Sequence, residues 1–398
     1  MRVVVVSPYA PYPGIDHAGG AYLQAYLETA ARRNEVHLFA PDSPENRRGQ
    51  RDHGTGAQIH LVPCRQAPSR PSVERLWNLR NFTQGLTLGW QVLRGFRQDA
   101  GFHRALEHAD RVEMHWDYTL PLIKHVPTTT PIFVFPHDVI AQTFQRRRAL
   151  YEQRTRRLAM AFLSARIRRQ EVRWLSQAQL VLLFSQKDVE LLSRAGVRTP
   201  MQVVDPLLET PPVPARLDGQ ALLFTGAMYR PENIDAVRWF LSSAWPTVRR
   251  AVPGATLVVA GSNPPEDLEA PGLELTGYVD DLNALHRDAR GVVIPLRAGA
   301  GLKFKVPQAM AWGLPVVSTT VGAEGLGDGA ATLAGVSDVP DELAAACVRL
   351  LTDDAFAHAV GDRARQWALS TYDTARSLGA VVDTMDDLTR ASRRQGAV

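Results

Sequence analysis

The feature that most constrains the fold is an alternation of short apolar runs with helical patterns. The runs are rich in Val, Ile, Leu and Phe and lack a polar alternation, as expected for strands that are covered on both faces. In the first half they span residues 3–7, 35–40, 58–62, 111–115, 131–135, 180–185 and 201–204. The helical patterns between them span 21–33, about 146–175, and 187–195. Ser185 and Asp188 suit the capping of the last helix. This alternation predicts a parallel sheet with helices on both faces.

A proline-rich break is followed by a second series of the same kind. Residues 205–219 read DPLLETPPVPARLDG, which is typical of an interdomain linker. Beyond it we expect strands over 221–225, 255–260, 273–276, 291–295 and 315–318, and helices over 231–251, 281–287 and 302–312. A chain of 398 residues also favours two domains. The sequence therefore predicts an α/β chain of two Rossmann-like, doubly wound domains facing a central cleft, with ligands at the carboxyl ends of the strands.

Composition limits the class of partner. There are 45 Lys and Arg against 41 Asp and Glu, and the net charge of +4 is too mild to argue for nucleic acid. Arginine supplies most of the positive charge, and its planar guanidinium suits phosphate or carboxylate ligands. Cys64 and Cys347 have no metal-type spacing, so a reducing, cytoplasmic location is the simplest interpretation. The apolar runs fall well short of the ~20 residues that a membrane span needs.

The segment 295–319, PLRAGAGLKFKVPQAMAWGLPVVST, carries the clearest chemistry. An expected strand opens there into a helix through a turn that consists of Gly299, Ala300, Gly301 and Leu302. Small residues in such a turn let backbone N–H groups approach an anion at the positive end of the helix. Lys303 and Lys305 fall in the expected first turn of the helix, beside the same site. The arrangement suits a diphosphate, although taken alone it equally fits a tight turn followed by surface lysines.

The same segment resembles the glycosyl transferases group 1 family. The family signature is a Gly-rich loop, a basic pair, Ala-Met-Ala and Gly-x-Pro-Val-Val-Ser-Thr, which this chain supplies in order between Gly299 and Thr319. Further ordered matches lie at 224–228, 231–236, 258–261, 276–280 and 322–325. The resemblance implies a GT-B fold and a retaining transfer of a sugar from a nucleotide-diphosphate donor, a UDP- or GDP-sugar, to a hydroxyl acceptor. The acceptor would be a glycan, a glycolipid or a small metabolite.

The resemblance also implies which residues act. Lys303 and Lys305 would stabilise the charge on the leaving diphosphate. His137, after the strand 131–135, would lie near the donor sugar as the third catalytic residue. Other donor contacts are expected from the turn 299–302 and from Gly19, Gly20, Gly226, Arg230, Tyr278, Val279 and Gln308. Gly19 and Gly20 are expected in a loop ahead of a helix, closing over the phosphates. No metal or cofactor is expected, since cationic side chains would replace a divalent ion.

Two positions depart from the family pattern and keep other functions open. Gln308 stands where the family normally has a glutamate that hydrogen-bonds the ribose, and Ala300 where it often has a second acid. An amide lacks the charge-assisted strength of a carboxylate, so a weakened, sugar- or nucleotide-binding protein of this fold is one alternative. A nucleotide-sugar epimerase is another, and it would need a pair of acid/base carboxylates. The first loop, 7–20, lacks G-x-G-x-x-G, which disfavours a dehydrogenase.

The domain roles follow from the resemblance. We expect an acceptor-side domain over 1–205, a linker over 206–219, a nucleotide-sugar-binding domain over 220–375, and a helix over 376–398 that packs back on the N-terminal domain. Trp116 directly follows the strand 111–115, and an aromatic ring there suits contact with the C–H surface of an acceptor sugar.

The stretch from Arg146 to Trp174 is rich in arginine. It suits either peripheral contact with anionic lipid or a solvated helix face whose apolar positions Leu158, Phe162 and Ile167 pack on the sheet. The second reading is favoured, and the charge would still help to recruit an acidic acceptor. No contact with nucleic acid is expected.

Overall fold

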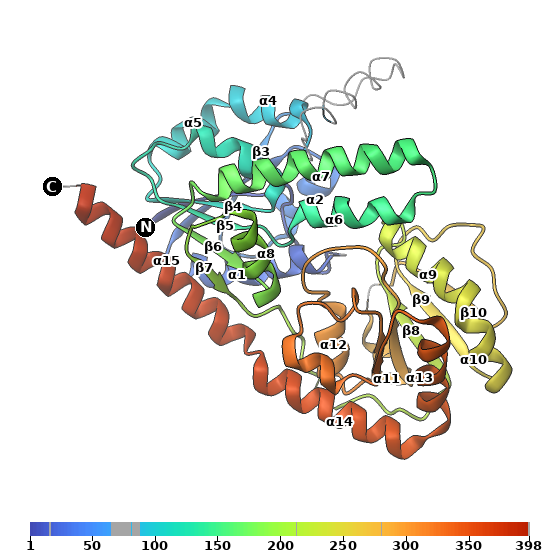
Figure 1. Cartoon of the computed structure of the whole chain (residues 1–398). Helices are drawn as coiled ribbons and strands as arrows, with labels where there is room; N and C mark the ends of the chain where they lie inside the picture. Colours follow the sequence, from blue (N-terminus) through green and yellow to red (C-terminus); the bar gives the residue numbers. More distant parts are fainter. Residues whose placement is uncertain (16, 65–80, 82–87, 212, 280, 397–398) are drawn as a thin grey trace. The chain divides into compact units, whose positions relative to one another are not determined.

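The chain folds into two compact units, which the computed structural model describes over residues 1–15, 17–64, 81, 88–211, 213–279 and 281–396. The first unit consists of Met1–Leu207 together with Thr374–Val398, and the second of Leu208–Asp373 (Figure 1). Asp280, which belongs to one of the family-like matches, lies outside the described residues.

The first unit contains a parallel sheet with the strand order β3-β2-β1-β4-β5-β6-β7 in the described part of the chain. Its strands are β1 (Arg2–Val6), β2 (Glu35–Pro41), β3 (Gln58–Val62), β4 (Arg111–His115), β5 (Ile132–Phe135), β6 (Leu180–Leu183) and β7 (Met201–Val203). Its helices are α1 (Ala18–Ala31), α2 (Pro44–Asp52), α4 (Trp90–Gln98), α5 (Ala100–Glu107), α6 (Ile140–Arg147), α7 (Arg154–Leu175), α8 (Gln186–Ala195) and α15 (Thr374–Gly396), with the 3-10 segments η1 (Asp117–His125) and η2 (Arg148–Leu150).

The second unit repeats the plan with the strand order β10-β9-β8-β11-β12-β13. Its strands are β8 (Ala221–Thr225), β9 (Thr256–Ala260), β10 (Leu273–Gly277), β11 (Gly291–Ile294), β12 (Val316–Ser318) and β13 (Gly335–Val336). Its helices are α9 (Pro231–Ser243), α10 (Trp245–Ala251), α11 (Asn283–Asp288), α12 (Lys305–Ala311), α13 (Pro340–Thr352) and α14 (Asp354–Thr371), with the 3-10 segment η3 (Gly327–Thr332).

Both sheets are doubly wound, so the α/β, Rossmann-like fold class expected from the sequence is confirmed. In each sheet the strand order reverses once, between β1 and β4 in the first unit and between β8 and β11 in the second. Loops at the carboxyl ends of these strand pairs diverge and leave the crevice in which such folds bind ligands. The strand orders therefore direct attention to the loops after β1, β4, β5, β8 and β11.

Several helix boundaries differ from the expected ones. The helix expected from residue 21 begins at Ala18, because the side chain of His17 caps it by accepting a 2.9 Å hydrogen bond from the N–H of Gly20. Gly19 therefore lies in the first turn of α1 and not in a loop ahead of it. The helix expected over 302–312 begins only at Lys305, so Lys303 belongs to the preceding loop.

Two expected long helices are each broken in two. The stretch 146–175 divides into the end of α6, η2 and α7, and 231–251 divides into α9 and α10 at Ala244. Because α7 pairs with α6 (Figure 1), Leu158 and Phe162 do not pack on the sheet as expected: their exposed fractions are 59% and 50%. Ile167 is buried, in a small cluster with Ile140 of α6.

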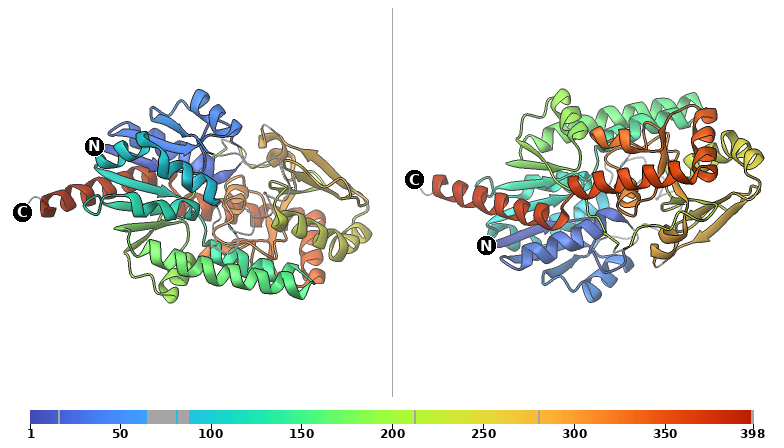
Figure 2. Two further views of the ribbon diagram at one scale, coloured as in Figure 1. Left: turned by 90° about the horizontal axis from the view of Figure 1, so that it is seen from above. Right: turned by 90° about the horizontal axis from the view of Figure 1, so that it is seen from below.

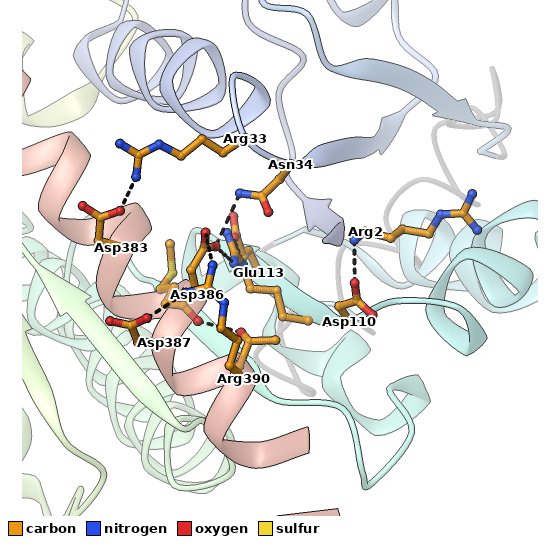
Figure 3. Close-up of polar contacts among 12 residues, drawn as sticks. Arg2, Arg33, Asn34, Asp110, Glu113, Asp383, Asp386, Asp387 and Arg390 are labelled. Carbon is orange, nitrogen blue, oxygen red and sulfur yellow. Dashed lines mark hydrogen bonds and ion pairs between the residues drawn. The ribbon is translucent and has the colours of Figure 1, made fainter. Parts of the chain in front are cut away.

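The C-terminal helix α15 lies against the first unit, as its red ribbon shows in each view (Figure 1, Figure 2). Asp386 of α15 accepts hydrogen bonds from Arg111 on β4 and from Asn34, 3.4 Å away, so a helix from the end of the chain joins the central strand (Figure 3). Arg111 also donates to Glu113 over 2.7 Å, and neither side chain is exposed. Arg33, in the turn after α1, forms a further ion pair with Asp383 of α15 (Figure 3).

Candidate active site

The crevice of the second unit is bordered by two glycine-containing loops. Gly226 directly follows β8 with a φ of 156°, and its N–H donates to the carbonyl of Ala260 over 2.9 Å. The loop after β11 turns through Gly299 and Gly301, whose φ values are 128° and 68°. Left-handed backbone of this kind favours glycine, because a Cβ would clash with the neighbouring carbonyl. The two loops start from neighbouring strands, β8 and β11, which pair in the sheet.

Lys305 closes the space between these loops. Its ammonium group donates to the carbonyl of Thr225 and lies 4.4 Å from the centre of the Phe224 ring. A Cβ added at Gly226 would lie only 2.6 Å from the Nζ of Lys305, so the glycine makes room for this contact. Burial above all, together with the charges of Arg230 and Lys303, lowers the pKa of Lys305 to about 7.

Lys303 and Arg230 complete a cationic group, which we call the basic cluster: Arg230, Lys303 and Lys305. The Nζ of Lys303 donates to the carbonyl of Gly301 over 2.7 Å and lies 3.8 Å from a carboxylate oxygen of Glu324. Arg230 precedes α9 and is exposed. Arg230 and Lys303 disfavour the charged form of Lys305, so the basic cluster is arranged to receive an anion, which would offset this repulsion.

The other expected donor residues of this unit lie around the same crevice edge. Ala300 and Leu302 are buried within the loop after β11. Tyr278 and Val279 follow β10, and the side chain of Tyr278 is 49% exposed. The sequence motif thus converges on the carboxyl edge of one sheet.

Gln308 has a different environment from the one that the family pattern implies. Its side-chain carbonyl accepts from the N–H of Glu209 over 3.0 Å, and its amide nitrogen donates to the carbonyl of Glu209 over 2.7 Å. A glutamate could make the first bond but would oppose the carbonyl in the second. The amide of Gln308 therefore satisfies both the N–H and the carbonyl of Glu209, which lies near the start of the second unit.

The crevice of the first unit contains two residues with strained backbone. Trp116 after β4 and His137 after β5 have φ values of 62° and 65°, which are uncommon for residues with a Cβ. Their rings stack face to face with centres 3.9 Å apart at an angle of 8°. Gly19 permits this approach at the start of α1: a Cβ there would lie 2.8 Å from the Trp116 ring and 3.3 Å from Nδ1 of His137.

Gly20 is needed in the same turn for a separate reason. A Cβ at Gly20 would meet Ile15 at 2.6 Å and His17 at 2.7 Å. Gly19 thus leaves room for Trp116 and His137 at the first turn of α1, and Gly20 leaves room for Ile15 and His17, while the helix N-terminus supplies N–H groups and a partial positive charge.

His137 is buried and has a second histidine at its other edge. Nε2 of His137 lies 3.4 Å from Nδ1 of His115, which is fully buried on β4. Burial lowers the pKa of His115 to about 3 and holds the pKa of His137 well below its usual value, with His115 and His17 adding to the effect on His137. Both imidazoles are therefore neutral near pH 7.

Sequence reasoning missed a buried carboxyl pair beside this crevice. Asp117 and Glu171 share a hydrogen bond, and Glu171 also accepts from the N–H of Ala141 over 2.9 Å. Burial raises the pKa of both carboxyls, so the pair holds a proton more readily than exposed carboxyls do. They line a cavity of about 20 Å³ together with Leu93, Tyr118 and Trp174. Asp117 and Glu171 are 54 residues apart in the chain, and no local pattern joins them.

A second missed feature left a readable signal. The polar residues Arg111, Glu113 and His115 alternate with Val112 and Met114 along β4, a strand that is buried throughout. Polar side chains with a period of two on a buried strand share one face and need partners there.

Within the described part of the chain, no helix is both long and apolar enough to cross a membrane.

Comparisons with known proteins define the class to which this arrangement belongs. The chain is similar to sucrose-phosphate synthase from Thermosynechococcus elongatus, with a TM-score of 0.72, 15% identity, and coverage of 98% of this chain and 99% of that one. It is also similar to WaaG, a glycosyltransferase involved in lipopolysaccharide biosynthesis, with a TM-score of 0.60, 16% identity and coverage of 96% and 99%. These likenesses show that the fold is GT-B.

Residues 219–353 match the family model described as glycosyl transferases group 1. This match confirms the resemblance to that family seen in the sequence. A shorter likeness, 30% identity over 118 residues, relates it to an uncharacterized 44.6 kDa protein in the cps region of Klebsiella pneumoniae. That match spans 27% of this chain and 30% of the relative.

Proposed function

We propose that the chain is a retaining glycosyltransferase that moves a sugar from a nucleotide-diphosphate donor to a hydroxyl acceptor. The observation that carries this proposal is the basic cluster at the strand-order reversal of the second unit. Lys305 is partly withdrawn from water there and has a depressed pKa, so a diphosphate is the kind of ligand that would restore its charge. The match of residues 219–353 to the group 1 family supports the same reading.

The reaction follows from the charge distribution. As the bond between the sugar and the diphosphate breaks, negative charge grows on the leaving phosphate, and preorganised cations there stabilise the transition state. In a retaining transfer the acceptor hydroxyl attacks from the side of the leaving group, and a phosphate oxygen takes its proton. Arg230, Lys303 and Lys305 would perform the work that a divalent ion does in other transferases. Neutral His137 of the first unit would hydrogen-bond the sugar of the donor. The acceptor is also proposed to bind the first unit.

The donor is proposed to be a UDP- or GDP-sugar. Structures similar to this chain include HepE of Anabaena in complex with UDP-glucose, with a TM-score of 0.64, 14% identity and coverage of 97% of this chain and 99% of that one. This similarity supports the nucleotide class and leaves the transferred sugar to experiment.

The acceptor is proposed to be a glycan, a glycolipid or a small metabolite. Exposed arginines at 154, 156, 157, 166, 168, 169 and 173 cover α7. They would attract an acidic acceptor or hold the protein peripherally at anionic lipid. A cytoplasmic location stays a prediction.

The test measures donor binding and turnover in the full-length protein. Thermal unfolding is compared with and without UDP-, GDP-, ADP- and dTDP-sugars, and donor consumption is followed for those that raise the melting temperature. Lys303→Ala and Lys305→Ala are expected to lower donor affinity and turnover about tenfold or more each, because a hydrogen bond to a charged group is lost. Arg250→Ala, which removes an exposed charge from α10, is the control and should behave as wild type. Unchanged kinetics in both lysine variants would contradict the proposal.

A second function, donor binding without transfer, is favoured by one observation. The side chain of Gln308 is engaged with the backbone of Glu209 at the position where the family pattern places a ribose contact. The two functions differ in outcome: a binding protein gains thermal stability from the donor and neither transfers nor hydrolyses the sugar.

A further inference from the structure

We propose that His115 is a positioning residue that fixes the tautomer of His137, so that Nδ1 of His137 carries the proton and points a hydrogen-bond donor at the start of α1. The geometry of four rings and one glycine supports this assignment, and its consequence for catalysis rests on the function proposed above.

Both imidazole rings are held in fixed planes. The His115 ring stacks on Phe135 with centres 4.4 Å apart at an angle of 8°, and the His137 ring stacks on Trp116 in the same way at 3.9 Å. Both histidines are buried, with exposed fractions of 0% and 8%. The relation between the two rings is therefore set by the sheet and not by the side chains' own preferences.

The two nitrogens of His137 have different neighbours. Nε2 faces Nδ1 of His115 at 3.4 Å. Nδ1 faces the first turn of α1, since a Cβ placed on Gly19 would lie 3.3 Å from it. Of the two nitrogens, Nδ1 is thus the one that faces the N-terminus of α1 at Gly19. An anion or a polar oxygen is favoured at such a helix terminus.

One proton must lie between the two rings if they are to hydrogen-bond. Each neutral imidazole has a single N–H, so either His115 donates from Nδ1 or His137 donates from Nε2. The pKa of each histidine is lowered by burial, which keeps both rings neutral. The two arrangements differ in whether Nε2 of His115, the nitrogen turned away from His137, carries a proton or a lone pair.

The remaining nitrogen of His115 decides between them. Nε2 of His115 is buried and has no hydrogen-bond partner among the residues that the structure describes. A proton on Nε2 would be a buried N–H without an acceptor, and such orphaned donors are rarer than under-satisfied acceptors. The favoured arrangement has the proton of His115 on Nδ1, where it donates to Nε2 of His137. His137 then carries its own proton on Nδ1.

This arrangement gives the proposed enzyme a hydrogen-bond donor, the Nδ1–H of His137, that needs no positive charge. A neutral Nδ1–H can hydrogen-bond a sugar or phosphate oxygen over the whole neutral pH range, because the pKa of His137 lies well below its usual value. Without His115, the proton of His137 is free to exchange between the two nitrogens.

Long-range proton–nitrogen NMR of the full-length, ¹⁵N-histidine-labelled protein tests the tautomer without any ligand. The ring nitrogens of His137 are assigned by their loss in His137→Phe. In the wild type we expect a pyrrole-type Nδ1 and a pyridine-type Nε2. His115→Phe, which keeps an aromatic ring against Phe135, is expected to mix or reverse these types. His115→Asn, whose amide N–H can take the place of Nδ1–H, is expected to restore them.

The matched control is His60→Phe. His60 also stacks on a phenylalanine, Phe39, at 4.7 Å, and this variant should leave the His137 signals unchanged. A pyridine-type Nδ1 in wild-type His137 would overturn the assignment, as would unaltered nitrogen types in folded His115→Phe.

The kinetic arm connects the tautomer to the proposed function. His115→Phe should lower kcat about tenfold, the effect of losing one hydrogen-bond donor, and His115→Asn should recover most of it. If the wild type shows the expected tautomer but no transfer, the glycosyltransferase proposal fails and the role of His115 stands. If transfer is present and His115→Phe keeps full kcat, the catalytic part of the inference is wrong.

Discussion

At the residue scale, Lys305 determines how the basic cluster responds to pH. Its pKa of about 7 in the unliganded protein means that it is charged below that pH and neutral above it. Binding of a diphosphate favours the charged form, so affinity should rise as pH falls from about 9 to about 7 and level off below, because a proton is taken up on binding. UDP-glucose suits this measurement, since its two phosphates do not titrate in that range.

Titration calorimetry across this pH range compares the wild type with Lys305→Ala. The variant should bind more weakly below pH 7 and lose most of the pH dependence, whereas Arg250→Ala should keep it. An equal slope in Lys305→Ala would show that another group takes up the proton.

The sequence predicted this basic cluster better than it predicted Gln308. Lys303 and Lys305 are recognisable because their chemistry is local: a turn of small residues, a helix start and two cations lie within a few positions. Gln308 stands out in the sequence as a departure, but its partner Glu209 lies 99 positions away in a segment without secondary structure. No periodicity marks such a contact, so only the folded chain explains why an amide is suitable there.

At the element scale, strands β1 to β12 were predictable, whereas β13 and the helix ends were not. A buried parallel strand is a continuous apolar run, which is visible at any position in the chain. Helix ends depend on single capping residues, and α1 is capped by His17, which is not among the usual capping residues. The early start of α1 moves Gly19 from a loop into a helix and changes what a substitution there should do.

Two glycines within helices give a matched pair. Gly19→Ala would place a Cβ 2.8 Å from the rigid ring of Trp116, whereas the Cβ of Gly379→Ala in α15 would meet no other part of the described chain within 4 Å. We expect the first to lower the free energy of unfolding by about 1–3 kcal/mol through overpacking, and to weaken donor binding. The second should raise it by about 0.5–1 kcal/mol, because alanine is the better helix former. Both helices belong to the first unit, and hydrogen exchange of the slowest amides of that unit measures both changes. A stabilised Gly19→Ala would mean that α1 and Trp116 are not in close contact.

At the scale of the whole molecule, the first unit is built from both ends of the chain. Arg111 and Asp386 are 275 residues apart, yet they form an ion pair with almost no exposed side-chain surface. The sequence contains both charges but offers no signal that pairs them, since the approach of α15 to β4 depends on the whole fold. The first unit therefore includes residues that are synthesised after the second unit, and we expect its stability to depend on them.

A matched pair of aspartates on α15 tests this dependence. Asp386→Ala leaves the buried guanidinium of Arg111 with Glu113 as its remaining carboxylate partner, and should lower the stability of the first unit by about 3 kcal/mol. Asp387, one residue away, is 77% exposed in its pair with Arg390, so Asp387→Ala should have little effect.

Hydrogen exchange is the suitable measurement, because a protein of two units need not unfold in one step. Peptides covering β4 and α15 should exchange faster in Asp386→Ala, while peptides covering β8 and β9 should keep the wild-type rate. Equal exchange in the two variants would show that α15 is held by its apolar face alone, through residues such as Val382 and Met385. Faster exchange in both units would show instead that they unfold together, and that the return of the chain stabilises the whole molecule.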